Sequence, residues 1–361
     1  MTRLIPILLL VHLFTIAKAQ SPLCLLKDTR TGNVDFRAEE LNDFLQLDKY
    51  RAIFFGEQHN AGFDPEIKYH LITDLNKRTG LRHVFLEMGF SSAWNINRYL
   101  QTGDTTYLYN PAWPRTHSLY SRLWTRLYEY NRGLPDGRKI VIHGVDFERT
   151  DVFRTLKRLA PIGQAVPAPL RPVMDTIAAH LSDPPLVMWK VIDGRFVVYD
   201  NSVFTRTLGY VQQQFLAYPD VTKTYFGSNY PVVEDIITND GLVEVRAKRR
   251  NSSMFTAMQQ IIDEQKIDRF IGFFGGQHTT YTVGNSLANA AAGLKGLHKS
   301  DILNIAEFAY NINTKDTAFR RKHFHELVAL NGSCKATVLP ARTVPEYKNE
   351  ADFVIIADIS E

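Results

Sequence analysis

Six short apolar runs, most of them followed directly by an acidic residue, constrain the fold of this chain more than any other feature. The runs occupy residues 52–55, 83–86, 140–145, 270–274, 302–306 and 353–357. Hydrophobicity is continuous along each run rather than alternating, which is typical of strands that helices cover on both faces. The pattern therefore predicts a mainly parallel central sheet.

Segments with helical spacing lie between these runs. Residues 66–78, 91–100, 119–130 and 251–264 each place apolar side chains on one stripe. Strands that alternate with helices indicate βαβ units, so we expect an α/β fold with the central sheet flanked by helices. Residues 150–240 break the alternation and predict a mostly helical insertion, which could form a cap. We expect residues 20–361 to form a single domain that includes this insertion.

The first 19 residues have the pattern of a signal peptide. Arg3 precedes an apolar run over residues 4–16, and Ala17-Lys18-Ala19 gives a small-x-small cleavage signal before Gln20. A retained anchor is the alternative, but the run is shorter than the roughly 20 residues that span a bilayer. No later segment is long and apolar enough for a membrane helix. We therefore expect a secreted or periplasmic protein with no integral membrane segment in its mature form.

Composition and charge exclude some partner classes. The chain is 45% hydrophobic and 22% charged, an ordinary globular mixture with enough apolar residues for a large core. Its formal net charge is only +4, of which residues 1–19 contribute Arg3 and Lys18. Such a weak charge gives no indication of nucleic acid or an anionic membrane as a partner. The two cysteines, Cys24 and Cys334, could pair in an oxidising compartment, and the sequence leaves this open.

Ionisable residues gather where the predicted strands end. In open α/β sheets, ligands bind beyond the carboxyl ends of the strands, and packing alone requires no charged group there. A series of acids and imidazoles at these ends is what the floor of a catalytic site would need. The residues are Glu57, His59, Glu87, Asp146, His278 and Glu307, and the neutral Gln277 stands next to His278.

Two of these strand ends share a short sequence motif. Residues 54–59 and 273–278 share the pattern Phe-Phe-Gly-x-Gln-His. If the two strands are neighbours, His59 and His278 converge on one place. A histidine that titrates near neutral pH can take a proton from water, a step worth roughly 10²–10⁴-fold in rate, and Glu57 or Glu87 could orient the ring.

The order of short motifs along the chain resembles the erythromycin esterase family. That family shows a Gly-Glu-x-x-His element, a helix with a lysine, a strand ending in glutamate, and an Asn-x-Tyr segment that leads to Thr-Gly. The matching elements here are Gly56-Glu57-Gln58-His59, Lys68, Phe85-Leu86-Glu87, residues 97–103, residues 124–131, Gly144-Val145-Asp146, residues 250–254, residues 275–278 and Asp358. The resemblance spans most of residues 50–360 and is weak in the insertion.

This resemblance implies a hydrolase that cleaves an ester or lactone-type acyl bond in a small molecule. His59 would be the base that activates water, with Glu57 and Glu87 in support, and His278 would bind or polarise the substrate. The further substrate contacts that we expect are Lys68, Asp146, Arg250 and Gln277. The sequence indicates neither the substrate nor the oligomeric state.

Two departures from the esterase pattern keep other functions open. His59 follows Glu57 after one residue instead of two, and Asn251 stands where esterases commonly have aspartate after the arginine. The shorter spacing is similar to ChaN-like haem-binding lipoproteins, in which case His59, His70 or His278 would be an axial haem ligand.

A metal-dependent hydrolase is the other alternative. Glu57, His59, Glu87 and His278 are of types that bind zinc, manganese or iron. We expect neither a metal nor another cofactor. The sequence has no Gly-x-Ser-x-Gly elbow, P-loop or Rossmann glycine pattern that would point to a different chemistry.

Overall fold

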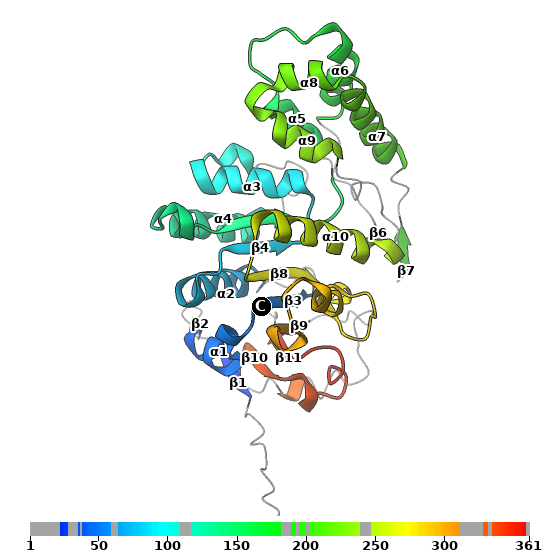
Figure 1. Cartoon of the computed structure of the whole chain (residues 1–361). Coiled ribbons are helices and arrows are strands. Elements are labelled where there is room, and N and C mark those ends of the chain that lie inside the picture. The colour runs from blue at the N-terminus through cyan, green and yellow to red at the C-terminus, as the bar shows by residue number, and fades with distance from the viewer. Residues whose placement is uncertain are drawn as a thin grey trace, which may run out of the picture.

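A nine-stranded sheet, counted over the described residues, forms the centre of the molecule (Figure 1). The computed structural model describes residues 22–27, 35–36, 38–58, 64–108, 117–149, 151–181, 189–192, 195–198, 202–238, 247–310, 328–330 and 334–358. The strands follow the order β2-β1-β10-β11-β9-β3-β8-β4-β5.

The six strands predicted from the apolar runs all form and lie side by side in parallel. They are β3 (Ala52–Glu57), β4 (His83–Leu86), β5 (Val141–Gly144), β8 (Phe270–Gly275), β9 (Ile302–Tyr310) and β11 (Phe353–Asp358). The predicted mainly parallel sheet is therefore confirmed. Because the strands are parallel, their carboxyl ends lie along one edge of the sheet.

Three further strands, which the sequence did not reveal, extend the sheet in antiparallel fashion. They are β1 (Leu23–Lys27), β2 (Asp35–Phe36) and β10 (Ala336–Pro340). All three are short, and proline ends β10, so their pattern is weak. Cys24 in β1 forms a disulfide with Cys334, just before β10, with the Cα atoms 5.7 Å apart. The pairing that the sequence left open is thus formed, and it joins β1 to the segment just before β10.

Helices cover both faces of the sheet, as the alternation predicts. On one face, α1 (Ala38–Leu45), α2 (Asp64–Thr79), α3 (Phe90–Thr102) and α4 (His117–Arg132) share a core with Phe55 and Phe273. On the other face, α10 (Ala247–Gln265) and α12 (Leu287–Ala290) pack with Phe54 and Phe274. Successive residues of a strand point to opposite faces, which explains why adjacent phenylalanines serve different cores.

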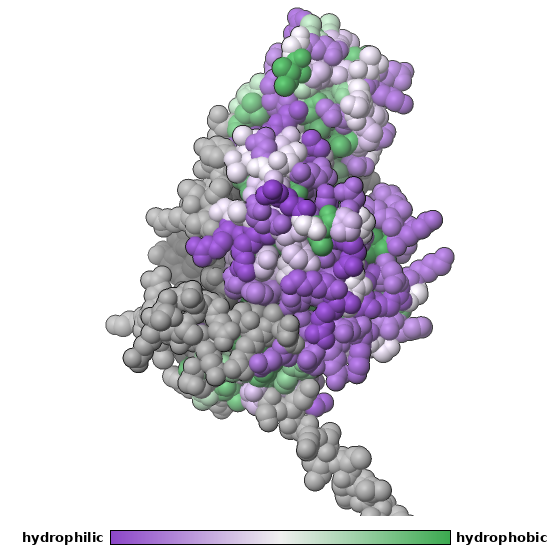
Figure 2. All heavy atoms as spheres, turned by 90° about the vertical axis from the view of Figure 1, so that its left-hand side faces the viewer, coloured by the Kyte–Doolittle hydropathy of each residue, from purple (hydrophilic) through white to green (hydrophobic). Residues whose placement is uncertain are grey.

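The insertion is mostly helical, as predicted, and has a core of its own. It contains α5 (Asp151–Leu159), α6 (Arg171–Ala179), α7 (Ser202–Ala217), α8 (Pro219–Phe226), α9 (Tyr230–Thr238) and the hairpin β6 (Trp189–Ile192) with β7 (Arg195–Val198). In Figure 1 its five helices lie at the top, beyond α3, whose Phe90 and Trp94 pack against their core. Figure 2 shows hydrophobic residues in patches over this part of the surface and mostly hydrophilic ones below it.

No described helix combines the length and the hydropathy that a bilayer span requires. The predicted signal peptide, residues 1–19, lies outside the described residues.

Candidate active site

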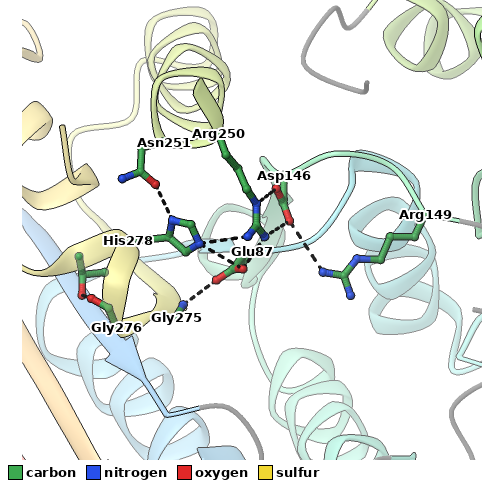
Figure 3. A network of polar contacts seen from close by, with 9 residues as sticks. Glu87, Asp146, Arg149, Arg250, Asn251, Gly275, Gly276 and His278 are labelled. Carbon is green, nitrogen blue, oxygen red and sulfur yellow. Dashed lines mark hydrogen bonds and ion pairs between the residues drawn. The ribbon is translucent and has the colours of Figure 1, made fainter. Parts of the chain in front are cut away.

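Arg250 is the centre of a polar network at the carboxyl edge of the sheet (Figure 3). Its Nε donates to Asp146 Oδ1 at 2.9 Å, and its Nη2 donates to Asp146 Oδ2 at 2.6 Å and to Glu87 Oε1 at 2.5 Å. Glu87 follows β4, Asp146 follows β5, and Arg250 reaches them from α10. The guanidinium therefore neutralises carboxylates from two neighbouring strands.

Burial and charge act in opposite directions on Arg250. Burial alone would lower its pKa, but the hydrogen bonds and negative charges of Asp146 and Glu87 raise the pKa above its ordinary value. The side chain of Asp146 is only 1% exposed. Because a buried carboxylate needs a paired charge or hydrogen bonds, Arg250 stabilises Asp146 at this position.

His278 belongs to the same network. It lies in α11 (Gly276–Thr279), the short helix that follows β8 directly. Its Nε2 is 3.2 Å from Arg250 Nη1 and 3.6 Å from Glu87 Oε1, and its Nδ1 is 2.5 Å from Asn251 Oδ1. The ring is thus contacted at both nitrogens by residues of other elements.

Close backbone packing holds α11 in place. Gly275 N donates to Glu87 Oε2 at 2.6 Å, and the Asn304 side chain donates to Thr279 O at 2.9 Å. On the neighbouring strand, Gly56 leaves the space that α11 needs, since a Cβ there would lie 2.5 Å from Thr279 Oγ1. These contacts place His278 beside Glu87.

Glu57 and Lys68 form a separate buried ion pair at the same edge. Lys68 Nζ, from α2, is 2.6 Å from Glu57 Oε1, and the two side chains are 5% and 8% exposed. Lys68 also lies over the Phe273 ring, 5.5 Å from its centroid. Glu57 pairs with Gly275 in the register of β3 and β8, so the ion pair and the Arg250 network lie on adjacent strands.

Gln58 fixes the chain immediately before His59. Its side-chain amide donates to Ala309 O at 2.8 Å and accepts from Ala309 N at 3.0 Å, which imitates a strand pairing with β9. Its backbone N–H donates to Glu307 Oε2 at 3.0 Å. His59 itself lies outside the described residues.

The loop that carries Asp146 is anchored to α3. Glu148, which is fully buried, accepts a hydrogen bond from Ser91 N at 2.8 Å, in the first turn of that helix. Burial raises the pKa of Glu148 to about 8. Gly89 is required beside it, because a Cβ would lie 2.5 Å from Glu148 Oε2.

The described carboxylates and imidazole do not fit a metal centre. Within the described residues, no group of three or more histidines, cysteines, aspartates or glutamates has the geometry to hold a metal ion. Arg250 occupies the position between Glu87, Asp146 and His278 that a cation would take, and Gly275 engages the other oxygen of Glu87.

Three solved structures share the architecture over almost the whole chain. A Bacillus cereus protein has a TM-score of 0.55 at 12% identity, covering 92% of this chain and 94% of its own. A mutant of the erythromycin esterase EreC, in its open conformation, has a TM-score of 0.52 at 14% identity, covering 91% and 96%. A succinoglycan biosynthesis protein has a TM-score of 0.53 at 11% identity, covering 89% and 91%. This chain has the erythromycin esterase-like fold.

At these identities the likeness concerns the fold, and it confirms the fold that the motif order implied. No model of a protein family matches the chain, and neither does any curated protein. The residues of the site must therefore be judged from their own geometry.

The erythromycin esterase-like fold brings most of the predicted residues to one edge. Glu87, Asp146, Arg250 and His278 form one network, and Glu57 with Lys68 lies beside it. Gln277 is exposed on α11. His70, one of the three candidate haem ligands, pairs through Nε2 with Glu66 on its own helix at 2.9 Å.

Two members of the network were not predicted as site residues. Asn251 follows Arg250 and contacts His278, and its place next to a predicted substrate contact was the available signal. Arg149 is three residues after Asp146, and its Nη2 lies 3.8 Å from Asp146 Oδ2. The Arg149 guanidinium lies 5.5 Å from the centroid of the Phe147 ring. Nothing in the sequence distinguishes Arg149 from other surface arginines.

Proposed function

We propose that this protein is a hydrolase that cleaves an ester or lactone-type acyl bond of a small molecule, with His59 as the base. The observation that carries the proposal is a cluster of ionisable side chains at the carboxyl edge of four neighbouring strands. Its members are Glu57, Glu87, Asp146 and His278. All three carboxylates there are matched by cations, the buried Lys68 or the partly buried Arg250. Such preorganised charge is what stabilisation of a polar transition state requires.

In this proposal His59 removes a proton from water as the water oxygen attacks the carbonyl carbon. The tetrahedral intermediate then collapses, and the proton passes to the leaving alkoxide, so that the products are an acid and an alcohol. Gln58, clamped to β9, fixes the chain next to the base. Arg250 Nη1 carries two N–H groups and directs one of them at His278. The second, which bonds to no residue that the structure describes, could be offered to a substrate oxygen.

The protein is proposed to act outside the cytoplasm, in the periplasm or as a secreted enzyme. The signal-peptide pattern of residues 1–19 supports this location. The disulfide between Cys24 and Cys334 supports it independently, because such bonds persist in oxidising compartments.

The described residues support metal-independent hydrolysis over a haem protein that uses His70 or His278 and over a metal-dependent hydrolase that uses Glu87 or Asp146. A haem ligand needs an imidazole nitrogen that points into a pocket, whereas both nitrogens of His278 face protein groups and His70 pairs with Glu66. A metal-dependent hydrolase would need the oxygens that Arg250 already engages.

The test is a screen of the purified chain, residues 20–361, against simple esters and lactones, with and without a chelator. Wild type would be compared with Glu87→Ala and with Gln265→Ala, which changes an exposed residue at the last position of α10, away from Arg250. We expect turnover by wild type and Gln265→Ala that a chelator does not affect, and loss of turnover in Glu87→Ala. Folded protein that shows a Soret band with haem and hydrolyses no ester would contradict the proposal.

A further inference from the structure

We propose that Asn251 is a positioning residue that holds His278 in a single tautomer, with the proton on Nδ1 and the lone pair on Nε2. The inference rests on the proposed function for its catalytic meaning, but the tautomer itself can be observed without activity. It assigns a role to Asn251, which neither the motifs nor the fold assigns.

The contact at Nδ1 determines where the proton lies. Asn251 Oδ1 is 2.5 Å from His278 Nδ1, and Asn251 is only 6% exposed. A carbonyl oxygen of an amide can only accept a hydrogen bond, so Nδ1 must donate. The neutral imidazole has one N–H, which this contact places on Nδ1.

The contacts at Nε2 agree with this assignment. Arg250 Nη1 is 3.2 Å away and can only donate, so a neutral ring accepts from it through the Nε2 lone pair. Glu87 Oε1 lies 3.6 Å from the same nitrogen. A proton that enters the ring therefore arrives at Nε2, between Glu87, which attracts it, and Arg250, which repels it.

The amide of Asn251 orients the ring without adding charge. A carboxylate at this position would add a third negative charge to Glu87 and Asp146 and would favour the imidazolium. The asparagine adds no such charge, and in the tautomer that we propose the Nε2 lone pair faces the groups at the centre of the network. For hydrolysis, this makes His278 a hydrogen-bond acceptor at rest and a proton carrier only at Nε2.

The experiment is a long-range ¹H–¹⁵N correlation spectrum of protein labelled with ¹⁵N-histidine, near neutral pH. His278 is assigned by its loss in His278→Gln. We expect a protonated Nδ1 and an unprotonated Nε2 in wild type, and a mixture of tautomers in Asn251→Ala. In Asn251→Asp, proton uptake at Nε2 should move to higher pH by about one unit, a tenfold gain in proton affinity.

Ser252→Ala is the matched control, because Ser252 is the next residue of α10 and is exposed. It should leave the His278 signals unchanged. A wild-type ring with its proton on Nε2, or an Asn251→Ala spectrum identical to wild type, would overturn the proposal. If Asn251→Asp does not fold, the Asn251→Ala spectrum decides alone.

Hydrolysis gives a separate readout. On any ester that the wild type cleaves, we expect Asn251→Ala to lower kcat at least tenfold with little change in KM, because the ring is misplaced rather than the substrate site. An unchanged kcat together with a changed tautomer would overturn the positioning role. Absence of a cleaved ester would instead count against the proposed function, while the spectrum would still test the tautomer.

Discussion

The two Phe-Phe-Gly-x-Gln-His segments lie on neighbouring strands, but they are offset by one residue. In the parallel register of β3 and β8, Phe55 lies beside Phe273 and Gly56 beside Phe274. A shift of one residue turns every side chain to the opposite face of a sheet. Accordingly, Phe54 and its counterpart by sequence, Phe273, belong to different cores.

The segments also differ in how the chain leaves the strand. After β3, Gln58 is clamped to β9 by two hydrogen bonds of its side chain. After β8, the chain turns at once into α11, where Gln277 is exposed and His278 joins the Arg250 network. Identical residues in the two segments thus make different contacts, because the register of the strands and the path of the chain after each strand decide the surroundings of each side chain.

Replacing the two cations near the segments, Arg250 and Lys68, should give the largest difference in stability. Arg250→Met would remove the cation that Glu87 and Asp146 share and should lower the free energy of unfolding by about 3–5 kcal/mol. Lys68→Met removes the cation beside a single carboxylate, Glu57, and should cost less. Urea unfolding near neutral pH measures both, and equal losses would show that Arg250 does not link two strands energetically.

Two stacked imidazoles in the sheet, His83 and His143, should make the protein sensitive to acid. His143 is buried and His83 is half-buried, and burial lowers the pKa of His83 to about 4 and of His143 to about 3. The unfolded chain binds protons below about pH 6.5, whereas these folded rings do not. Stability is therefore complete above that pH and falls as the pH is lowered toward the pKa values of the folded state, by roughly 3 kcal/mol for His143 at pH 4.

Unfolding curves between pH 8 and 4 measure this loss. The loss should be smaller in His143→Phe, which cannot be protonated and can stack on Phe85 as His143 does. The same steepness in both proteins would show that other groups cause the acid sensitivity.

Glycines near the two strand exits should differ in their tolerance of a methyl group. Gly56→Ala would place a Cβ 2.5 Å from Thr279 Oγ1 and 3.2 Å from Gly276 Cα, so we expect a loss of about 2 kcal/mol. Gly276→Ala meets nothing closer than 3.7 Å and should be nearly neutral. Thermal unfolding of the two variants compares them directly, and the reverse order would contradict the close approach of α11 to β3.

The smallest difference in stability should be between variants of the two glutamines, Gln58 and Gln277. Gln58→Ala removes two hydrogen bonds to Ala309 and should cost about 1–2 kcal/mol. Gln277→Ala changes an exposed side chain and should stay within about 0.5 kcal/mol. Chemical unfolding of both variants is the measurement, and a loss in Gln277→Ala as large as in Gln58→Ala would show that the segments are more alike than the register implies.

Much of the fold could be predicted, because continuous apolar runs and helical stripes are local signals. All six parallel strands and the helices over residues 66–78, 91–100, 119–130 and 251–264 were predicted from them. The antiparallel strands β1, β2 and β10 were not predicted, because they are short and lack a clear pattern.

The site could be predicted only in part. Strand ends identified Glu87, Asp146 and His278, since parallel strands bring their carboxyl ends together. The offset between the segments and the contact of Asn251 with His278 depend on register and on helix placement, which no local pattern encodes.

The central claim is that the β3 segment supplies the base while the β8 segment supplies a fixed partner. Steady-state kinetics of His59→Ala and His278→Ala on one cleaved ester, in the presence of a chelator, test it most directly. We predict that His59→Ala lowers kcat by roughly 10²–10⁴-fold, the usual contribution of a general base, and that His278→Ala lowers it less. Full activity of folded His59→Ala would contradict the claim.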